Sequence, residues 1–292
     1  MSSIRLNKCM ITPKIIWQIS GQCTHECWYC LSKYRNNPYF KTTDEYLNVI
    51  NLLQNYGDRS SIPKLSWKFK GGEPLQFPNF NLLLKEIKSK ESYVAVETAG
   101  GNSWFDFMEI SGNIDELVLT YHYWQNESLL DYIIDMMQEE KKKLKVIMPM
   151  LPGKIQECRD VAESIKDRGV NIQEQLLVSS NGAALEKYTM RDLNIYHRRP
   201  EDWVPPPPPE IPVWIDPRID DGAPVYTGKP CWAGVDWLYI DSKGFAKGSE
   251  CGGRDIHNVF EPGWTPPDAP FPCSMMFCRN DDDKKNIRIN QS

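Results

Sequence analysis

Strand-like and helix-like segments alternate along the first two thirds of this 292-residue chain, and this alternation limits the folds that it can adopt. When each strand is followed by a helix, the strands form a parallel sheet with right-handed crossovers. Six such units predict an α/β fold, a partial (β/α)6 barrel whose reactive face lies at the carboxyl ends of the strands. The predicted strands are 13–20, 64–70, 92–98, 116–123, 144–151 and 171–179, and the clearest predicted helices are 44–56, 80–90, 129–140 and 155–168.

The alternation runs to about residue 182, and from residue 199 the sequence changes character. Residues 199–230 include five consecutive prolines, Pro205 to Pro209, which predict a stiff polyproline-II linker, with a docking motif for an aromatic groove as the alternative. Residues 231–280 carry cysteines around a predicted β-hairpin, and 281–292 form a polar tail. We therefore expect a barrel at 1–198, a linker, a small cysteine-rich module and a tail.

The composition excludes several classes of function. A net charge of −5 provides no overall basic field for a nucleic-acid backbone. No apolar run approaches the roughly 20 residues that span a membrane, and the N-terminus lacks the apolar segment of a signal peptide. We expect a cytoplasmic protein, in which cysteines stay reduced and more often bind metals or act in catalysis than form disulfides.

Three of the nine cysteines, Cys23, Cys27 and Cys30, stand in one short loop after the first predicted strand, separated by three residues and then two. Soft thiolates select iron–sulfur clusters, zinc or copper(I). Three ligands instead of four leave one metal position open for chemistry. A structural zinc site with His25 or Glu26 as the fourth ligand is the alternative.

A second motif, Gly71-Gly72-Glu73-Pro74, ends the second predicted strand. Glycines allow a close approach of the backbone, and a carboxylate pairs with a cation. Because the carboxyl ends of parallel strands meet at one edge, the motif is expected beside the cysteine loop.

The CxxxCxxC pattern, with the aromatic Tyr29 before its last cysteine, resembles the radical S-adenosylmethionine superfamily. This resemblance implies a [4Fe-4S] cluster whose open iron chelates S-adenosylmethionine. In that family, one electron cleaves the cofactor to a 5′-deoxyadenosyl radical, which abstracts a hydrogen atom from the substrate. The resemblance also implies an electron donor such as flavodoxin or ferredoxin.

Further cofactor-binding residues follow from the same resemblance. Tyr29 matches the aromatic that packs near the adenine, and Gly71 to Pro74 match the family's GGEP motif, in which the backbone and Glu73 receive the ammonium of the methionine moiety. Thr120 corresponds to a serine near the ribose or the methionine carboxylate. Glu97-Thr98 are expected either to face the cofactor or to form a salt bridge, and His122 either lines the substrate cavity or fills the interior.

Four further cysteines, Cys231, Cys251, Cys273 and Cys278, have gaps of 19, 21 and 4 residues, with a predicted hairpin turn at 242–244 between the first two. They resemble the twitch type of C-terminal extension, a shortened SPASM module, which implies an auxiliary [4Fe-4S] cluster. The closing CxxxxC pair departs from that pattern, and a structural Cys₄ zinc site is the alternative. Cys158 lies in a predicted helix, either as a small buried hydrophobe or as a hydrogen donor.

Three functions therefore remain open from the sequence. The first is a two-cluster enzyme that oxidises, crosslinks or epimerises a peptide or small molecule after hydrogen abstraction. The second is a single-cluster enzyme that modifies a nucleoside-like substrate and holds structural zinc at its C-terminal cysteines. The third is a zinc-stabilised interaction protein. Five tryptophans suit either a peptide or sugar substrate or the core of the small module: Trp203, Trp214, Trp232, Trp237 and Trp264.

Overall fold

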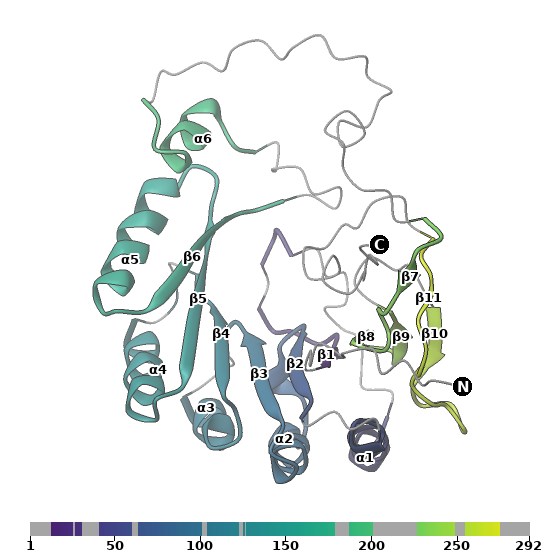
Figure 1. The fold of residues 1–292 in the computed structure, drawn as a ribbon. Coiled ribbons are helices and arrows are strands. Elements are labelled where there is room, and N and C mark those ends of the chain that lie inside the picture. The colour runs from purple at the N-terminus through teal and green to yellow at the C-terminus, as the bar shows by residue number, and fades with distance from the viewer. Residues whose placement is uncertain are drawn as a thin grey trace, which may run out of the picture.

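The predicted strands form one parallel sheet in the computed structural model, which confirms the expected α/β fold (Figure 1). The described residues are 13–25, 27–30, 41–59, 64–100, 104–122, 125, 127–178, 187–200, 227–248 and 255–274. The six barrel strands lie side by side in chain order, each parallel to the next. They are β1 (Lys14–Ser20), β2 (Ser66–Gly71), β3 (Tyr93–Thr98), β4 (Glu116–Thr120), β5 (Lys143–Met150) and β6 (Asn171–Leu176).

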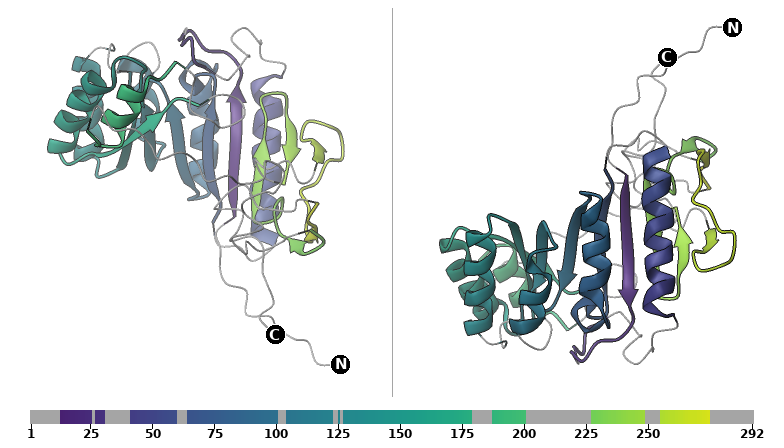
Figure 2. Two further views of the ribbon diagram at one scale, coloured as in Figure 1. Left: turned by 90° about the horizontal axis from the view of Figure 1, so that it is seen from above. Right: turned by 90° about the horizontal axis from the view of Figure 1, so that it is seen from below.

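Helices cover the outer face of the curved sheet (Figure 1). Figure 2 shows α1 and α2 in front of the strands from below and behind them from above, as right-handed crossovers require. The helices are α1 (Thr43–Arg59), α2 (Phe80–Ser89), α3 (Trp104–Ser111), α4 (Glu127–Glu139), α5 (Ile155–Asp167) and α6 (Met190–Tyr196), with a short 3-10 turn, η1, at Pro74–Gln76.

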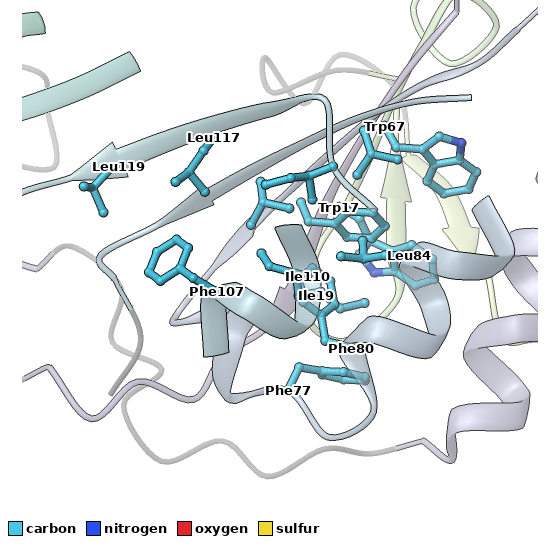
Figure 3. Close-up of a cluster of buried hydrophobic side chains, with 14 of the residues drawn as sticks. Trp17, Ile19, Trp67, Phe77, Phe80, Leu84, Phe107, Ile110, Leu117 and Leu119 are labelled. Atoms are coloured by element: carbon cyan, nitrogen blue, oxygen red, sulfur yellow. The ribbon is translucent and has the colours of Figure 1, made fainter. Parts of the chain in front are cut away.

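The core lies between these helices and the strands (Figure 3). The two inner strands β1 and β2 contribute large side chains, including Trp17, Trp67 and Phe69, which are almost completely buried. The helix α2 buries Phe80, Leu83, Leu84 and Ile87, a spacing that places them on one face of a helix. Strands with two buried faces can be apolar at consecutive positions, which explains why β3 buries Val94, Ala95 and Val96.

The C-terminal segment extends the barrel sheet past β1. The predicted hairpin is confirmed: β8 (Trp237–Ile240) and β9 (Phe245–Lys247) are antiparallel, and Gly244 in their turn has a φ of 85°. The strand β8 pairs in parallel with β1, and β10 (Asp255–Asn258) pairs with β9. Two short strands, β7 (Pro230–Cys231) and β11 (Phe271–Pro272), form a separate antiparallel pair. The proline run and the polar tail lie outside the described residues, so the proposed division into parts stays a prediction.

Two helices were not predicted from the sequence. The helix α3 has only eight residues, several of them aromatic, so its sequence lacks a clear alternation of apolar and polar faces. The helix α6 has seven residues, begins with a capping box formed by Thr189 and Asp192, and ends against Arg159 of α5. The Arg159 guanidinium donates to the carbonyl oxygens of Ile195 and Tyr196 at 2.6 and 3.0 Å. This contact between distant residues stabilises a helix too short to stand alone. None of the helices in the described part of the chain has the length and apolar character needed to cross a membrane.

The packing of α2 predicts different consequences for two leucines on the same helix. Leu84 is 0% exposed and Leu82 is 49% exposed. We expect Leu84→Ala to lower the free energy of unfolding by about 2–5 kcal/mol, because it leaves a cavity in the core. The matched control Leu82→Ala should change it by less than about 0.5 kcal/mol. Urea unfolding followed by circular dichroism measures both, and equal effects would contradict this description of the core.

Candidate functional site

The two sequence motifs meet at the carboxyl edge of the sheet. The cysteine loop follows β1, and Gly71 to Pro74 follow β2, its parallel neighbour. The loops after β3 and β4 reach the same edge and contribute Ala99 and His122. The predicted location of the site at the strand ends therefore agrees with the topology, since ligands of parallel sheets bind at this edge.

The end of β2 lies directly against the chain that leaves β1. The Gly72 N–H donates to the Ser20 carbonyl at 2.8 Å, and the Glu73 N–H donates to the Gln22 carbonyl at 2.7 Å. A Cβ added at Gly71 would lie 2.4 Å from the Ser20 oxygen, and one added at Gly72 would lie 2.0 Å from the Gln22 oxygen. Both glycines are therefore required for this close approach to the chain leaving β1, and their predicted contact with a cofactor stays a prediction.

The Glu73 side chain is completely buried and connects the ends of β2 and β3. Its Oε1 accepts hydrogen bonds from the Leu75 N–H at 3.0 Å and from the Thr98 hydroxyl, and its Oε2 accepts one from the Ala99 N–H at 2.8 Å. Burial raises the pKa of this carboxyl, while these donors lower it.

One position beside this carboxylate can take a further donor. A carboxylate oxygen can accept two hydrogen bonds, so Oε2 has capacity for one more than the Ala99 N–H provides. The His25 Nε2 lies 3.8 Å from it and, among the described residues, is a buried atom without a hydrogen-bond partner. A buried carboxylate oxygen and a buried ring nitrogen therefore face each other beside the cysteine loop.

A glutamine side chain fixes the first half of the loop. The Gln76 amide accepts from the Thr24 N–H at 3.2 Å and donates to the Thr24 hydroxyl. Sequence reasoning missed this pair, because no local pattern connects residues 52 positions apart. Gln125, which bonds the loops after β3 and β4, was missed for the same reason.

The three loop cysteines are within reach of solvent: Cys23 and Cys27 are half-buried and Cys30 is exposed. Burial raises the pKa of the Cys23 thiol to about 11. Within the described residues, no three His, Cys, Asp or Glu side chains surround a point that one metal ion could occupy. A cubane cluster makes a different demand, because its cysteine ligands bind separate iron atoms. The soft donor set fits such a cluster.

Tyr29 of the loop contacts His122, which follows β4. The Tyr29 hydroxyl lies 2.5 Å from His122 Nδ1, and His122 Nε2 lies 3.7 Å from Cys27 Sγ. Burial lowers the pKa of His122 to about 4 and raises the pKa of Tyr29. The sequence left two roles open for His122, lining the substrate cavity or filling the interior. In the structure it contacts Cys27, a predicted metal ligand. The adenine contact predicted for Tyr29 stays a prediction.

The structure also places the other barrel residues that the sequence singled out. Glu97 forms a salt bridge with Lys68 at 2.6 Å, which agrees with the salt-bridge alternative, while Thr98 bonds Glu73. Thr120 is the half-buried last residue of β4, at the reactive edge, and its cofactor contact stays a prediction. Cys158 of α5 is 0% exposed and belongs to the core cluster, and its role as a hydrogen donor is likewise untested.

Two of the four C-terminal cysteines come together. Cys231 on β7 and Cys273 directly after β11 are buried in one small cluster with Ala233. Cys251 and Cys278 lie outside the described residues. Five tryptophans were left open between substrate binding and a core role, and Trp203 and Trp214 lie outside the described residues. Trp237 and Trp264 are buried, and the Trp264 indole donates to the Ile256 carbonyl at 2.8 Å. These two are therefore interior side chains, and Trp264 belongs to the core cluster that the C-terminal strands share with the barrel.

No family model matches the chain, and no curated protein matches its sequence. Solved structures do match. SuiB from Streptococcus suis bound to S-adenosylmethionine is 15% identical with a TM-score of 0.54, over 87% of this chain and 64% of SuiB. SuiB bound to its precursor peptide SuiA gives a TM-score of 0.53 at 15% identity, over 86% of this chain and 63% of SuiB.

A second neighbour, anSMEcpe with bound AdoMet, is 11% identical with a TM-score of 0.52, over 94% of this chain and 80% of anSMEcpe. The chain spans less than two thirds of the length of SuiB. At these identities the likeness establishes the fold, and this fold agrees with the one that the cysteine and glycine motifs imply. The chain therefore has the partial-barrel fold of the radical S-adenosylmethionine enzymes.

Proposed function

We propose that the protein is a radical S-adenosylmethionine enzyme. The observation that supports this most strongly is the contact of Gly72 and Glu73 with the end of β1 and the start of the cysteine loop, through two backbone hydrogen bonds to Ser20 and Gln22. Three thiolates would hold three irons of a [4Fe-4S] cluster. Gly71 to Pro74, Tyr29 and Thr120 would bind S-adenosylmethionine on the open iron. Together, a reduced cluster and S-adenosylmethionine supply a 5′-deoxyadenosyl radical that removes a hydrogen atom from the substrate.

The chain's own residues would orient and shield this chemistry. Glu73 Oε2 has capacity for one further donor, which suits the ammonium of the methionine moiety. The carboxylate is held by the Leu75 and Ala99 N–H groups, so its oxygens are fixed before a ligand arrives. Trp28, 51% exposed, packs edge-to-face against Tyr29 within the loop.

A peptide is the substrate class that we propose. The structure of SuiB with its precursor peptide SuiA supports this choice, because the two chains share a fold. The overall charge of −5 does not favour a nucleic-acid substrate. A cytoplasmic location and an electron donor such as flavodoxin or ferredoxin complete the proposal.

The C-terminal cysteines would hold a second [4Fe-4S] cluster that accepts or relays an electron, so that the net reaction is an oxidation, a crosslink or an epimerisation. The common burial of Cys231 and Cys273 supports a shared site. Structural zinc at these cysteines is the second candidate.

Reductive cleavage of S-adenosylmethionine tests the enzyme proposal. Anaerobically reconstituted protein with dithionite should release 5′-deoxyadenosine, measured by chromatography. Cys27→Ala should reduce the release to background, because the cluster loses one of three ligands. The same protein before reconstitution is the control. Absence of product from iron-loaded protein would contradict the enzyme proposal.

The contact of Gly72 with the Gln22 carbonyl gives a second test with a matched control. Gly72→Ala places a methyl group against the Gln22 carbonyl and should displace the cysteine loop, whereas a Cβ at Gly112 meets nothing within 4 Å. We expect Gly72→Ala to lower the iron bound after reconstitution several-fold and Gly112→Ala to leave it unchanged. If both variants bound iron like the wild type, the close approach of Gly72 to Gln22 would have no role in forming the site.

Metal analysis separates the candidates at the C-terminal cysteines. With two clusters, reconstituted protein should contain about eight irons per chain, and Cys231→Ser with Cys273→Ser should retain about four. About four irons with about one zinc, and loss of the zinc in the double variant, would instead establish the structural zinc site.

A further inference from the structure

His122 is held in a fixed place behind the cysteine loop. It follows β4 and is 4% exposed. Its N–H donates to Gln125 Oε1 at 2.7 Å, and Gln125 Nε2 donates to the Ala99 carbonyl at 2.8 Å. One glutamine amide therefore connects the backbone of His122 to the end of β3, so the ring projects from an anchored position.

Both ring nitrogens of His122 face the same loop. Nδ1 lies 2.5 Å from the Tyr29 hydroxyl oxygen, and Nε2 lies 3.7 Å from Cys27 Sγ, within hydrogen-bonding range for sulfur. The two partners are 93 and 95 positions away in sequence. The ring thus bridges Cys27, a predicted metal ligand, and Tyr29, which directly precedes a second predicted ligand, Cys30.

The Tyr29 hydroxyl lies closer to Nδ1, at 2.5 Å, than to Nε2, at 3.5 Å, so we assign its hydrogen bond to Nδ1. A cysteine that ligates a metal is a thiolate, which carries no proton and only accepts. For a hydrogen bond between Nε2 and Sγ, Nε2 therefore carries the ring proton and donates. In a neutral imidazole this leaves Nδ1 as an acceptor, and the Tyr29 hydroxyl donates to it. In this arrangement the Tyr29 hydroxyl favours the tautomer that directs an N–H group at Cys27.

We propose that His122 is a positioning residue that donates an N–H···S hydrogen bond to the Cys27 ligand and thereby raises the reduction potential of the loop cluster. Donors to cluster sulfurs stabilise the additional negative charge of the reduced state. This role rests on the proposed cluster at Cys23, Cys27 and Cys30. It concerns the ease of electron transfer into the cluster, a property distinct from cluster assembly.

A redox titration followed by electron paramagnetic resonance tests the proposal on the reconstituted full chain. The loop cluster is identified as the signal that changes when S-adenosylmethionine is added. His122→Phe, which keeps an aromatic ring but no donor, should lower its midpoint potential by at least about 59 mV, a tenfold change in a one-electron equilibrium. His122→Gln retains an N–H donor and should restore at least half of the shift. His197→Phe, at an exposed position on the C-terminal end of α6, is the control and should leave the potential unchanged.

The outcomes separate the two proposals. Wild-type protein without iron, or without a signal that responds to S-adenosylmethionine, overturns the proposed function. A responsive signal whose potential is the same in wild type and His122→Phe overturns only the role of His122. If neither His122 variant binds iron, pulsed resonance on wild type and His25→Gln with ¹⁵N-labelled histidine decides. A histidine nitrogen coupling that persists in His25→Gln supports the hydrogen bond, and its absence overturns it.

Discussion

The close approach of β2 to the chain leaving β1 is the contact on which the candidate site depends. The N–H groups of Gly72 and Glu73 reach the carbonyls of Ser20 and Gln22, and no side chain could occupy the space between them. The parallel pairing of β1 with β2 brings the two segments together, and the glycines let them touch. The direction of the cysteine loop is thus determined by backbone contacts before any metal ligand is considered.

Glu73 connects the end of β2 to the end of the neighbouring strand β3. A buried carboxylate is costly unless its oxygens are hydrogen-bonded, and Leu75, Thr98 and Ala99 supply those donors. The residue that would receive the cofactor's ammonium therefore also connects the ends of β2 and β3. Structure and binding share one side chain here, so substitutions of Glu73 would affect both. Gly72→Ala tests the backbone contact that shapes the site, and His122→Phe tests the properties of the cluster, so neither test requires a substitution of Glu73.

Much of this could be predicted from sequence because the decisive signals are local. Strand β1, the loop from Cys23 to Cys30 and the turn at Gly71-Gly72 are contiguous patterns, and strand order follows from alternation with helices. Contacts between distant residues could not be predicted in this way. Gln76 on Thr24, and Arg159 at the end of α6, depend on side chains brought together only by folding. The pairing of β8 with β1 was missed for the same reason, since a hairpin sequence does not specify which edge it joins.

The central claim is that the loop of Cys23, Cys27 and Cys30 leaves one iron open for S-adenosylmethionine. Pulsed electron paramagnetic resonance with the cofactor labelled by ¹⁵N in its amino group measures this directly on the reduced, reconstituted protein. We expect a strong nitrogen coupling, because the amino group would be a ligand of the open iron. A reduced cluster that shows no such coupling at saturating S-adenosylmethionine would contradict the claim.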